Sequence, residues 1–259
     1  MPIPERLNPT FASARKVAVR GSDPLEQARA RLIVALDVPD AASAAKLVKR
    51  LHGACIWFKV GMELFTAVGP SVLEPILKGG HQVFLDLKFH DIPNTVAGAV
   101  RSAAGLGVHM LNVHSSGGPA MLAAARAALD GLPNPPELLA VTMLTSMDQV
   151  QVCAVGLDRS PAEQVELLAR MSLTAGIRGF VCSAQEVATL RALTGPEGVL
   201  VIPGIRPAGA EIGDQSRVAT PAEALRQGAS YLVVGRPITQ APDPAAAAEA
   251  ILQEMATAL

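Results

Sequence analysis

The sequence lacks a charge imbalance and has few aromatic residues. Its 22 lysine and arginine residues against 23 aspartate and glutamate residues give a formal net charge of −1, with no block of one sign. Nucleic acid or an anionic membrane is therefore not expected as the main partner. Aromatic residues make up 3% of the chain, so we expect no stacking platform for single-stranded nucleic acid.

Paired cysteines and long apolar runs are also missing. Cys55, Cys153 and Cys182 are odd in number and far apart, which is neither a disulfide framework nor a metal-site spacing. No apolar run approaches the roughly 20 residues of a membrane helix. The first thirty residues contain four prolines and lack the apolar segment of a signal peptide. We therefore expect a cytoplasmic protein with no membrane partner.

The chain is long enough for one large α/β domain, since half of its 259 residues are hydrophobic. Residues 1–30 are predicted to form a polar N-terminal extension and residues 31–259 a single domain. In this domain eight apolar runs alternate with alanine- and leucine-rich helical stretches. The predicted strands are Leu32–Leu36, Ile56–Val60, Gln82–Leu87, Met110–Val113, Leu138–Thr142, Gly179–Cys182, Leu200–Ile202 and Tyr231–Val234.

Eight strands that alternate with helices predict a (β/α)₈ barrel, the TIM-barrel fold. The predicted helices lie near Ala41–Leu51, Pro70–Lys78, Thr95–Gly105, Pro119–Leu129, Pro161–Ala175, Ala184–Leu193, Pro221–Gln227 and Pro244–Ala256. The alternative is an open doubly wound sheet. It is disfavoured because no G-x-G-x-x-G motif follows the first strand.

Charged side chains gather at the predicted strand ends, where barrel enzymes have their active sites. Asp86 and Lys88 are two residues apart on the third strand, so they share one face. Asp91 follows in the short connection before Pro93, which suits the first turn of a helix. The first three strands together supply charges of alternating sign: Asp37, Lys59, Asp86, Lys88 and Asp91.

A structural role for these charges has to be weighed against a catalytic one. A lone aspartate at the end of a strand, such as Asp37, often caps the next helix. Lys59 lies between Phe58 and Val60 and needs a carboxylate partner or a shifted pKa, which a purely structural ion pair would also satisfy. A cluster of three charges in the Asp86–Asp91 stretch favours a functional site. No histidine has a partner at ligand spacing, so we predict no metal site.

The last two strand ends carry glycine and arginine. Arg206 follows Pro203-Gly204-Ile205, and Arg236 follows Gly235. These arginines could be ordinary surface residues, but loops after strands seven and eight of a barrel often bind phosphate. Glycine lets backbone N–H groups approach an anion, and arginine binds it with two hydrogen bonds. Gln215 lies in a long connection and is a candidate to close over the phosphate.

The stretch Asp86-Leu87-Lys88-Phe89-His90-Asp91-Ile92-Pro93-Asn94-Thr95 closely resembles the signature of bacterial-type orotidine 5′-phosphate decarboxylases. The resemblance extends from about Leu32 to near the C-terminus. Its further motifs are Ala35-Leu36-Asp37, Phe58-Lys59-Val60-Gly61, Asn112-Val113-His114, Leu144-Thr145-Ser146-Met147, Val181–Glu186, Pro203–Pro207, Gly213-Asp214-Gln215 and Val234–Thr239.

The resemblance implies a homodimeric barrel without metal or cofactor that converts orotidine 5′-phosphate to uridine 5′-phosphate and CO₂. This is the last step of de novo UMP synthesis. Lys88 would donate the proton to C6 of the pyrimidine, with Asp86 beside the leaving carboxylate. The other implied roles are ribose binding and charge orientation by Lys59 and Asp37, entry of Asp91 and Thr95 into the partner subunit's site, pyrimidine binding by Thr145 and Ser146, and phosphate binding by Arg206, Gln215, Gly235 and Arg236.

Two other functions remain open at this point. Sugar-phosphate barrels related to this family, such as keto-gulonate phosphate decarboxylases and hexulose-phosphate synthases, share D-x-K-x-x-D but use Mg²⁺ and an enediolate. The Phe89-His90 and Ile92–Thr95 context favours the pyrimidine enzyme. An inactive barrel that only binds a phosphorylated ligand would be expected to have a broken charge array, and here all five charges are present.

Overall fold

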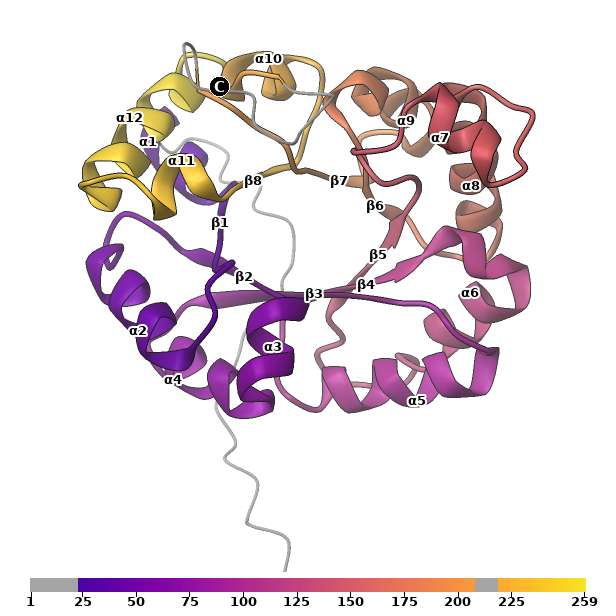
Figure 1. Cartoon of the computed structure of the whole chain (residues 1–259), viewed down its shortest axis with the longest axis horizontal. Helices are drawn as coiled ribbons and strands as arrows, with labels where there is room; N and C mark the ends of the chain where they lie inside the picture. The colour runs from indigo at the N-terminus through magenta and orange to yellow at the C-terminus, as the bar shows by residue number, and fades with distance from the viewer. Residues whose placement is uncertain (1–22, 208–218) are drawn as a thin grey trace, which may run out of the picture.

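The computed structural model describes residues 23–207 and 219–259, and these form a closed eight-stranded barrel (Figure 1). All neighbouring strands are parallel, and β8 pairs with β1 to close the ring. The prediction of a (β/α)₈ barrel is therefore confirmed. The strands are β1 Leu32–Ala35, β2 Trp57–Gly61, β3 Gln82–Phe89, β4 Met110–His114, β5 Glu137–Val141, β6 Gly179–Val181, β7 Val199–Ile202 and β8 Tyr231–Val234.

Helices surround the barrel in a continuous outer layer (Figure 1). The main ones are α2 Ala41–Arg50, α4 Leu73–Lys78, α5 Pro93–Ala104, α6 Gly118–Ala127, α8 Pro161–Thr174, α9 Val187–Thr194, α10 Pro221–Arg226 and α12 Pro244–Ala256. A short helix α1, Pro24–Arg29, packs against α12. Three further short helices were not predicted: α3 Met62–Val68, α7 Gln149–Ala154 and α11 Arg236–Thr239.

Helix starts follow the local chemistry of the sequence. Proline occupies the first turn of several helices, where its missing N–H leaves no hydrogen bond unmade. Ser160 and Thr220 each form a capping box with the glutamate three residues later. These signals are short-range, which explains why the helix starts at Pro161, Pro221 and Pro244 were predicted to the residue.

The core has two layers, because strand residues alternate between the barrel interior and the surrounding helices. Ile33 and Trp57 belong to the interior cluster, whereas Leu32, Val34 and Phe58 belong to the layer between strands and helices. Large apolar side chains thus close the interior of the barrel. Polar side chains appear toward the carboxyl ends of the strands, where the active sites of barrel enzymes lie.

The three cysteines all lie within the described residues. Cys55, Cys153 and Cys182 are free thiols, and the first and last of them are buried. Burial raises the pKa of the Cys55 thiol to about 12. Among the helices of residues 23–207 and 219–259, none is both long and apolar enough to span a lipid bilayer.

Candidate active site

Four of the five predicted charges form one chain of ion pairs at the carboxyl ends of β1, β2 and β3. Lys59 Nζ lies 2.8 Å from Asp37 Oδ1 and 3.4 Å from Asp86 Oδ2. Lys88 Nζ lies 2.6 Å from Asp86 Oδ1. The parallel register places Ala35 beside Lys59 and Gly61 beside Asp86, which brings the three strand ends together. The order is therefore acid, base, acid, base.

Burial and charge act against each other at the centre of this chain. Burial by itself would lower the pKa of Lys59, but the carboxylates of Asp86 and Asp37 outweigh it, so the pKa is raised. Burial would raise the pKa of Asp86, but the ammonium groups of Lys59 and Lys88 hold it below its ordinary value. Both groups therefore remain charged at neutral pH, although each side chain is only 11% exposed.

Lys88 has an unusual backbone for a residue in a strand. Its φ is +51°, the left-handed region, and no other non-glycine residue in the described part of the chain has a positive φ. The pairing of β3 with β4 is irregular at the same place, between Leu85 and Phe89. Simple alternation predicted that Asp86 and Lys88 would share a face, and their side chains do meet, although the strand between them is not regular.

Two contributors to this site were given no role from the sequence. Asn112 on β4 is fully buried and bonds both to Asp86 and to the Lys88 backbone. Gly61 ends β2, and a Cβ at this position would lie 2.9 Å from Lys59 Nζ. The signal for Asn112 was an uncharged polar residue inside the apolar run Met110–Val113. Gly61 appeared only as the last residue of the Phe58-Lys59-Val60-Gly61 motif, and its closeness to the Lys59 ammonium is a property of the folded chain that the sequence does not show.

Asp91 and Thr95 lie apart from the charge chain. Asp91 is exposed in the connection between β3 and α5, as predicted, and its carboxylate accepts a hydrogen bond from the Ile92 N–H at 2.6 Å. Within the described ranges Asp91 has no ion pair. Thr95 is exposed in the first turn of α5, and Ile92 beside them is 67% exposed. This edge of the site faces outward.

Thr145 and Ser146 follow β5 in the connection that leads to α7. Thr145 is half-buried and Ser146 is exposed, and the Ser146 carbonyl accepts a hydrogen bond from Gln151 Nε2 at 3.3 Å. Their position at the carboxyl end of β5 puts them on the same rim of the barrel as the charge chain.

The predicted phosphate-binding residues lie at the ends of β7 and β8. Arg206 is half-buried, and its backbone N–H bonds to the Ala219 carbonyl at 3.0 Å. Arg236 is exposed and is the first residue of α11, after Gly235. A Cβ at Gly235 would lie 3.7 Å from Asp37 Oδ2, which places this glycine beside the first member of the charge chain. Gln215 lies outside the described residues.

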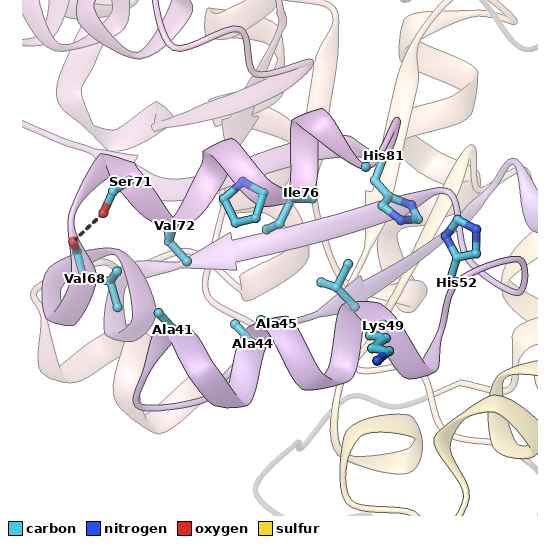
Figure 2. Close-up of a pocket in the computed structure, with 13 residues that line it drawn as sticks. Ala41, Ala44, Ala45, Lys49, His52, Val68, Ser71, Val72, Ile76 and His81 are labelled. Carbon is cyan, nitrogen blue, oxygen red and sulfur yellow. Dashed lines mark hydrogen bonds between the residues drawn. The ribbon is translucent and has the colours of Figure 1, made fainter.

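A separate hollow of about 330 Å³ lies in the outer helix layer, between α2 and α4 (Figure 2). Its walls are mainly apolar, with Ala44, Val72 and Ile76 among them. His52 and His81 close one end, with ring centroids 5.7 Å apart. None of the residues that line this hollow belongs to the charge chain or to the other predicted site residues, so the hollow is separate from the candidate site.

Comparison with known proteins assigns the barrel to a family. Residues 30–251 match the family model described as "Orotidine 5'-phosphate decarboxylase / HUMPS family". This chain belongs to that family.

Relatives within the family are similar over most of their length. A protein of Moorella thermoacetica named orotidine 5′-phosphate decarboxylase is 55% identical over 234 residues, which cover 88% of this chain and 93% of the relative. One of Nitrosococcus oceani with the same name is 52% identical over 227 residues, covering 88% and 98%. The crystal structure of orotidine 5′-phosphate decarboxylase from Lactobacillus acidophilus matches with a TM-score of 0.76 and 40% identity, covering 87% of this chain and 98% of that one.

Proposed function

We propose that this chain decarboxylates orotidine 5′-phosphate to uridine 5′-phosphate and CO₂, the last step of de novo UMP synthesis. The observation that carries the proposal is the alternating chain Asp37–Lys59–Asp86–Lys88 at the carboxyl ends of three strands. Curated relatives at 52–55% identity carry the name of this decarboxylase, which supports the pyrimidine substrate over a sugar phosphate.

The chemistry requires a positive charge at one carbon atom. When the bond between C6 and the carboxylate breaks, its electron pair stays on C6 in the plane of the ring, where no π system delocalises it. An ammonium held at C6 stabilises this charge in a preorganised way. Lys88 Nζ then gives its proton to C6, which forms the C6–H bond of the product and leaves a neutral amine.

The neighbours of Lys88 keep it charged and oriented. Asp86 lies 2.6 Å from the ammonium and, in the proposed complex, beside the leaving carboxylate of the substrate. Lys59 and Asp37 bind the ribose hydroxyl groups, and Lys59 at the same time compensates the buried charge of Asp86. Thr145 and Ser146 contact the pyrimidine ring from the end of β5.

Phosphate binding takes place at the opposite end of the substrate. Arg206, Arg236 and the backbone at Gly235 bind the phosphate, with Gln215 from the connection after β7. Arginine suits this role because its planar group makes paired hydrogen bonds to phosphate oxygens. Binding energy from this remote group contributes to holding C6 against Lys88 in the transition state.

No metal ion or cofactor is needed in this proposal. Carboxylates that converge at a strand end are the usual ligands of Mg²⁺. Here the Lys59 ammonium occupies the position between the Asp37 and Asp86 carboxylates that a cation would take. The charge of the site is thus balanced by side chains of the protein.

We further propose that the active form is a homodimer in the cytoplasm. Asp91 and Thr95 would enter the partner's site, and the exposed Ile92 between them would be covered by the second copy. A carboxylate with no cation in its own described chain is suited to meet one in a partner. Three free thiols support a reducing compartment.

A spectrophotometric assay tests the reaction itself. The full chain, treated with excess EDTA and freed of it by gel filtration, should convert orotidine 5′-phosphate to uridine 5′-phosphate with one CO₂ per turnover. Absence of turnover by folded protein would refute the proposed reaction. Turnover of a hexulose or keto-gulonate phosphate that needs added Mg²⁺ would move the chain to the sugar-phosphate branch of the family.

A further inference from the structure

The ladder between β3 and β4 breaks at the proposed proton donor. Leu85 pairs with Leu111, and the next pair is Phe89 with Val113. Strand β3 thus advances four residues while β4 advances two. The additional length is accommodated where Lys88 adopts φ +51°. A lysine in the left-handed region is costly unless the surrounding structure holds it there.

Asn112 occupies the gap that this break leaves on β4. Its side-chain oxygen Oδ1 accepts a hydrogen bond from the Lys88 backbone N–H at 2.7 Å. The side chain thus replaces the backbone partner that a regular ladder would supply. Asn112 is 0% exposed, so the contact is shielded from bulk solvent.

The other end of the same amide holds Asp86. Asn112 Nδ2 donates to Asp86 Oδ1 at 2.7 Å, and this is the oxygen that Lys88 Nζ contacts at 2.6 Å. The backbone of Lys88 and its ammonium are therefore both tied to one amide, the first directly and the second through one carboxylate oxygen. These contacts form a closed ring of hydrogen bonds through three residues.

The chemistry of the two partners fixes which way the amide faces. A backbone N–H requires an acceptor and an ionised carboxylate requires a donor, and a primary amide offers one of each. Leucine at this position would have the shape without either hydrogen bond. Aspartate would present a second carboxylate to Asp86 unless one of the two were protonated. Of these residues, only asparagine satisfies both partners at neutral pH.

We propose that Asn112 is a positioning residue, which holds Lys88 in its left-handed conformation and so places the ammonium for proton transfer. This rests on the proposed function of Lys88. The side-chain hydrogen bonds of Asn112 go to Lys88 and Asp86, and not to the residues proposed to bind the phosphate or the ribose. Its loss should therefore lower kcat more than it changes KM. A displacement of about 1 Å at a reacting group can reduce the rate by about 100-fold.

The test compares N112A and N112D with wild-type enzyme. Turnover of orotidine 5′-phosphate by wild-type protein in the same assay establishes the reaction, so its absence would refute the proposed function rather than the role of Asn112. N112A should lower kcat by about 100-fold, with KM within about threefold. T194V serves as the matched control, because Thr194 is 1% exposed and lies at the end of α9, before β7 and on the opposite rim. It should leave kcat unchanged.

The pH profile separates positioning from general damage. In N112D the new carboxyl faces Asp86, with the ammonium groups of Lys59 and Lys88 and the ring of His114 nearby. A shared proton between the two carboxyl groups would restore one acceptor and one donor. The kcat of N112D relative to wild type should therefore rise at least tenfold from pH 8 to pH 5, while the ratio for N112A stays constant.

Parallel profiles of N112D and N112A would overturn the proposal, as would a kcat of N112A within threefold of wild type. A crystal structure of either variant gives a readout without activity. In the crystal structure of N112A, and in that of N112D at pH 8, the Lys88 backbone should leave the left-handed region. Retention of φ near +51° in the variant would show that the backbone does not depend on Asn112.

Discussion

The Asp86 carboxylate is divided between two ammonium groups: Lys88 Nζ lies 2.6 Å from one of its oxygens, and Lys59 Nζ lies 3.4 Å from the other. One buried anion thus sets the position of two cations. Displacing any one of these three charged groups changes the electrostatic environment of the other two. Substitutions within this ion-pair network should therefore have non-additive effects. This coupling makes the site testable at residues that never touch substrate.

Gly61 offers such a test, because a methyl group there would collide with Lys59. G61A should move the Lys59 ammonium away from Asp37 and Asp86, since the new Cβ would lie 2.9 Å from Nζ. We expect kcat/KM to fall by about 10- to 100-fold. Steady-state kinetics of G61A, K59A and the double variant measure this.

The double variant decides how Gly61 acts. If glycine is needed only to leave room for Lys59, the G61A change should cost almost nothing further in a K59A background. Fully additive losses would instead mean that Gly61 acts on the backbone or on substrate directly.

The free energy of unfolding should depend on pH through Asp86. Its pKa is lowered from 3.8 on folding, so the charge network contributes stability above that pH and loses it as the pH falls through the lower folded value. At pH 7, D86N should lower the unfolding free energy by about 3 kcal/mol, because it leaves two ammonium groups less compensated. Urea unfolding followed by circular dichroism gives the unfolding free energies of wild type and of D86N.

The difference between wild type and D86N should be constant from about pH 5 to pH 9 and shrink below about pH 4. Lys59 makes stability depend on pH in the alkaline range. Its pKa is raised above 10.5, so its contribution is complete below that value and is lost only as the pH rises through the higher folded value. A difference in unfolding free energy between wild type and D86N that grows on acidification would contradict the network of charges described here.

Arg236 should act on the phosphate alone. R236A should lower kcat/KM for orotidine 5′-phosphate by about 10- to 100-fold, the value of a charged hydrogen bond or two. The nucleoside orotidine, which lacks the phosphate, should be affected less than about twofold. R226A, in the exposed last turn of α10, is a control that should leave both substrates unaffected. Equal losses for both substrates with R236A would place this arginine elsewhere in the mechanism.

The shared site of the proposed dimer can be tested by mixing inactive variants. In a heterodimer of K88A and D91A chains, one site receives both changes and the other receives neither. Random reassortment of equal amounts makes half of the dimers mixed, so about a quarter of wild-type activity should return under two-fold symmetry. Unfolding and refolding the two variants together, followed by the assay, measures this recovery. No activity from proven heterodimers would mean that Asp91 serves its own subunit.

The fold could be predicted because most strands are short apolar runs and most main helices begin at a proline or after a capping residue, although α4 and α9 begin at neither. The α3, α7 and α11 helices were missed because they are four to seven residues long and lie in connections, where tertiary contacts outweigh local signals. The contact of Asp86 with Lys88 followed from their spacing. The left-handed Lys88 did not, because it depends on Asn112, 24 residues further along the chain.

The central claim is that Lys88 donates the proton to C6, and the K88A variant tests it most directly. The assay should show a fall in kcat of about 10⁴-fold or more, since the same ammonium stabilises the carbanion and protonates it. Circular dichroism and calorimetric binding of uridine 5′-phosphate should show that the variant is folded and still binds nucleotide. The control is K78A, because Lys78 is an exposed lysine paired with Glu74 on α4. Its kcat should match that of wild type. A folded K88A enzyme that keeps more than about a hundredth of wild-type turnover would contradict the assignment of Lys88 as the proton donor.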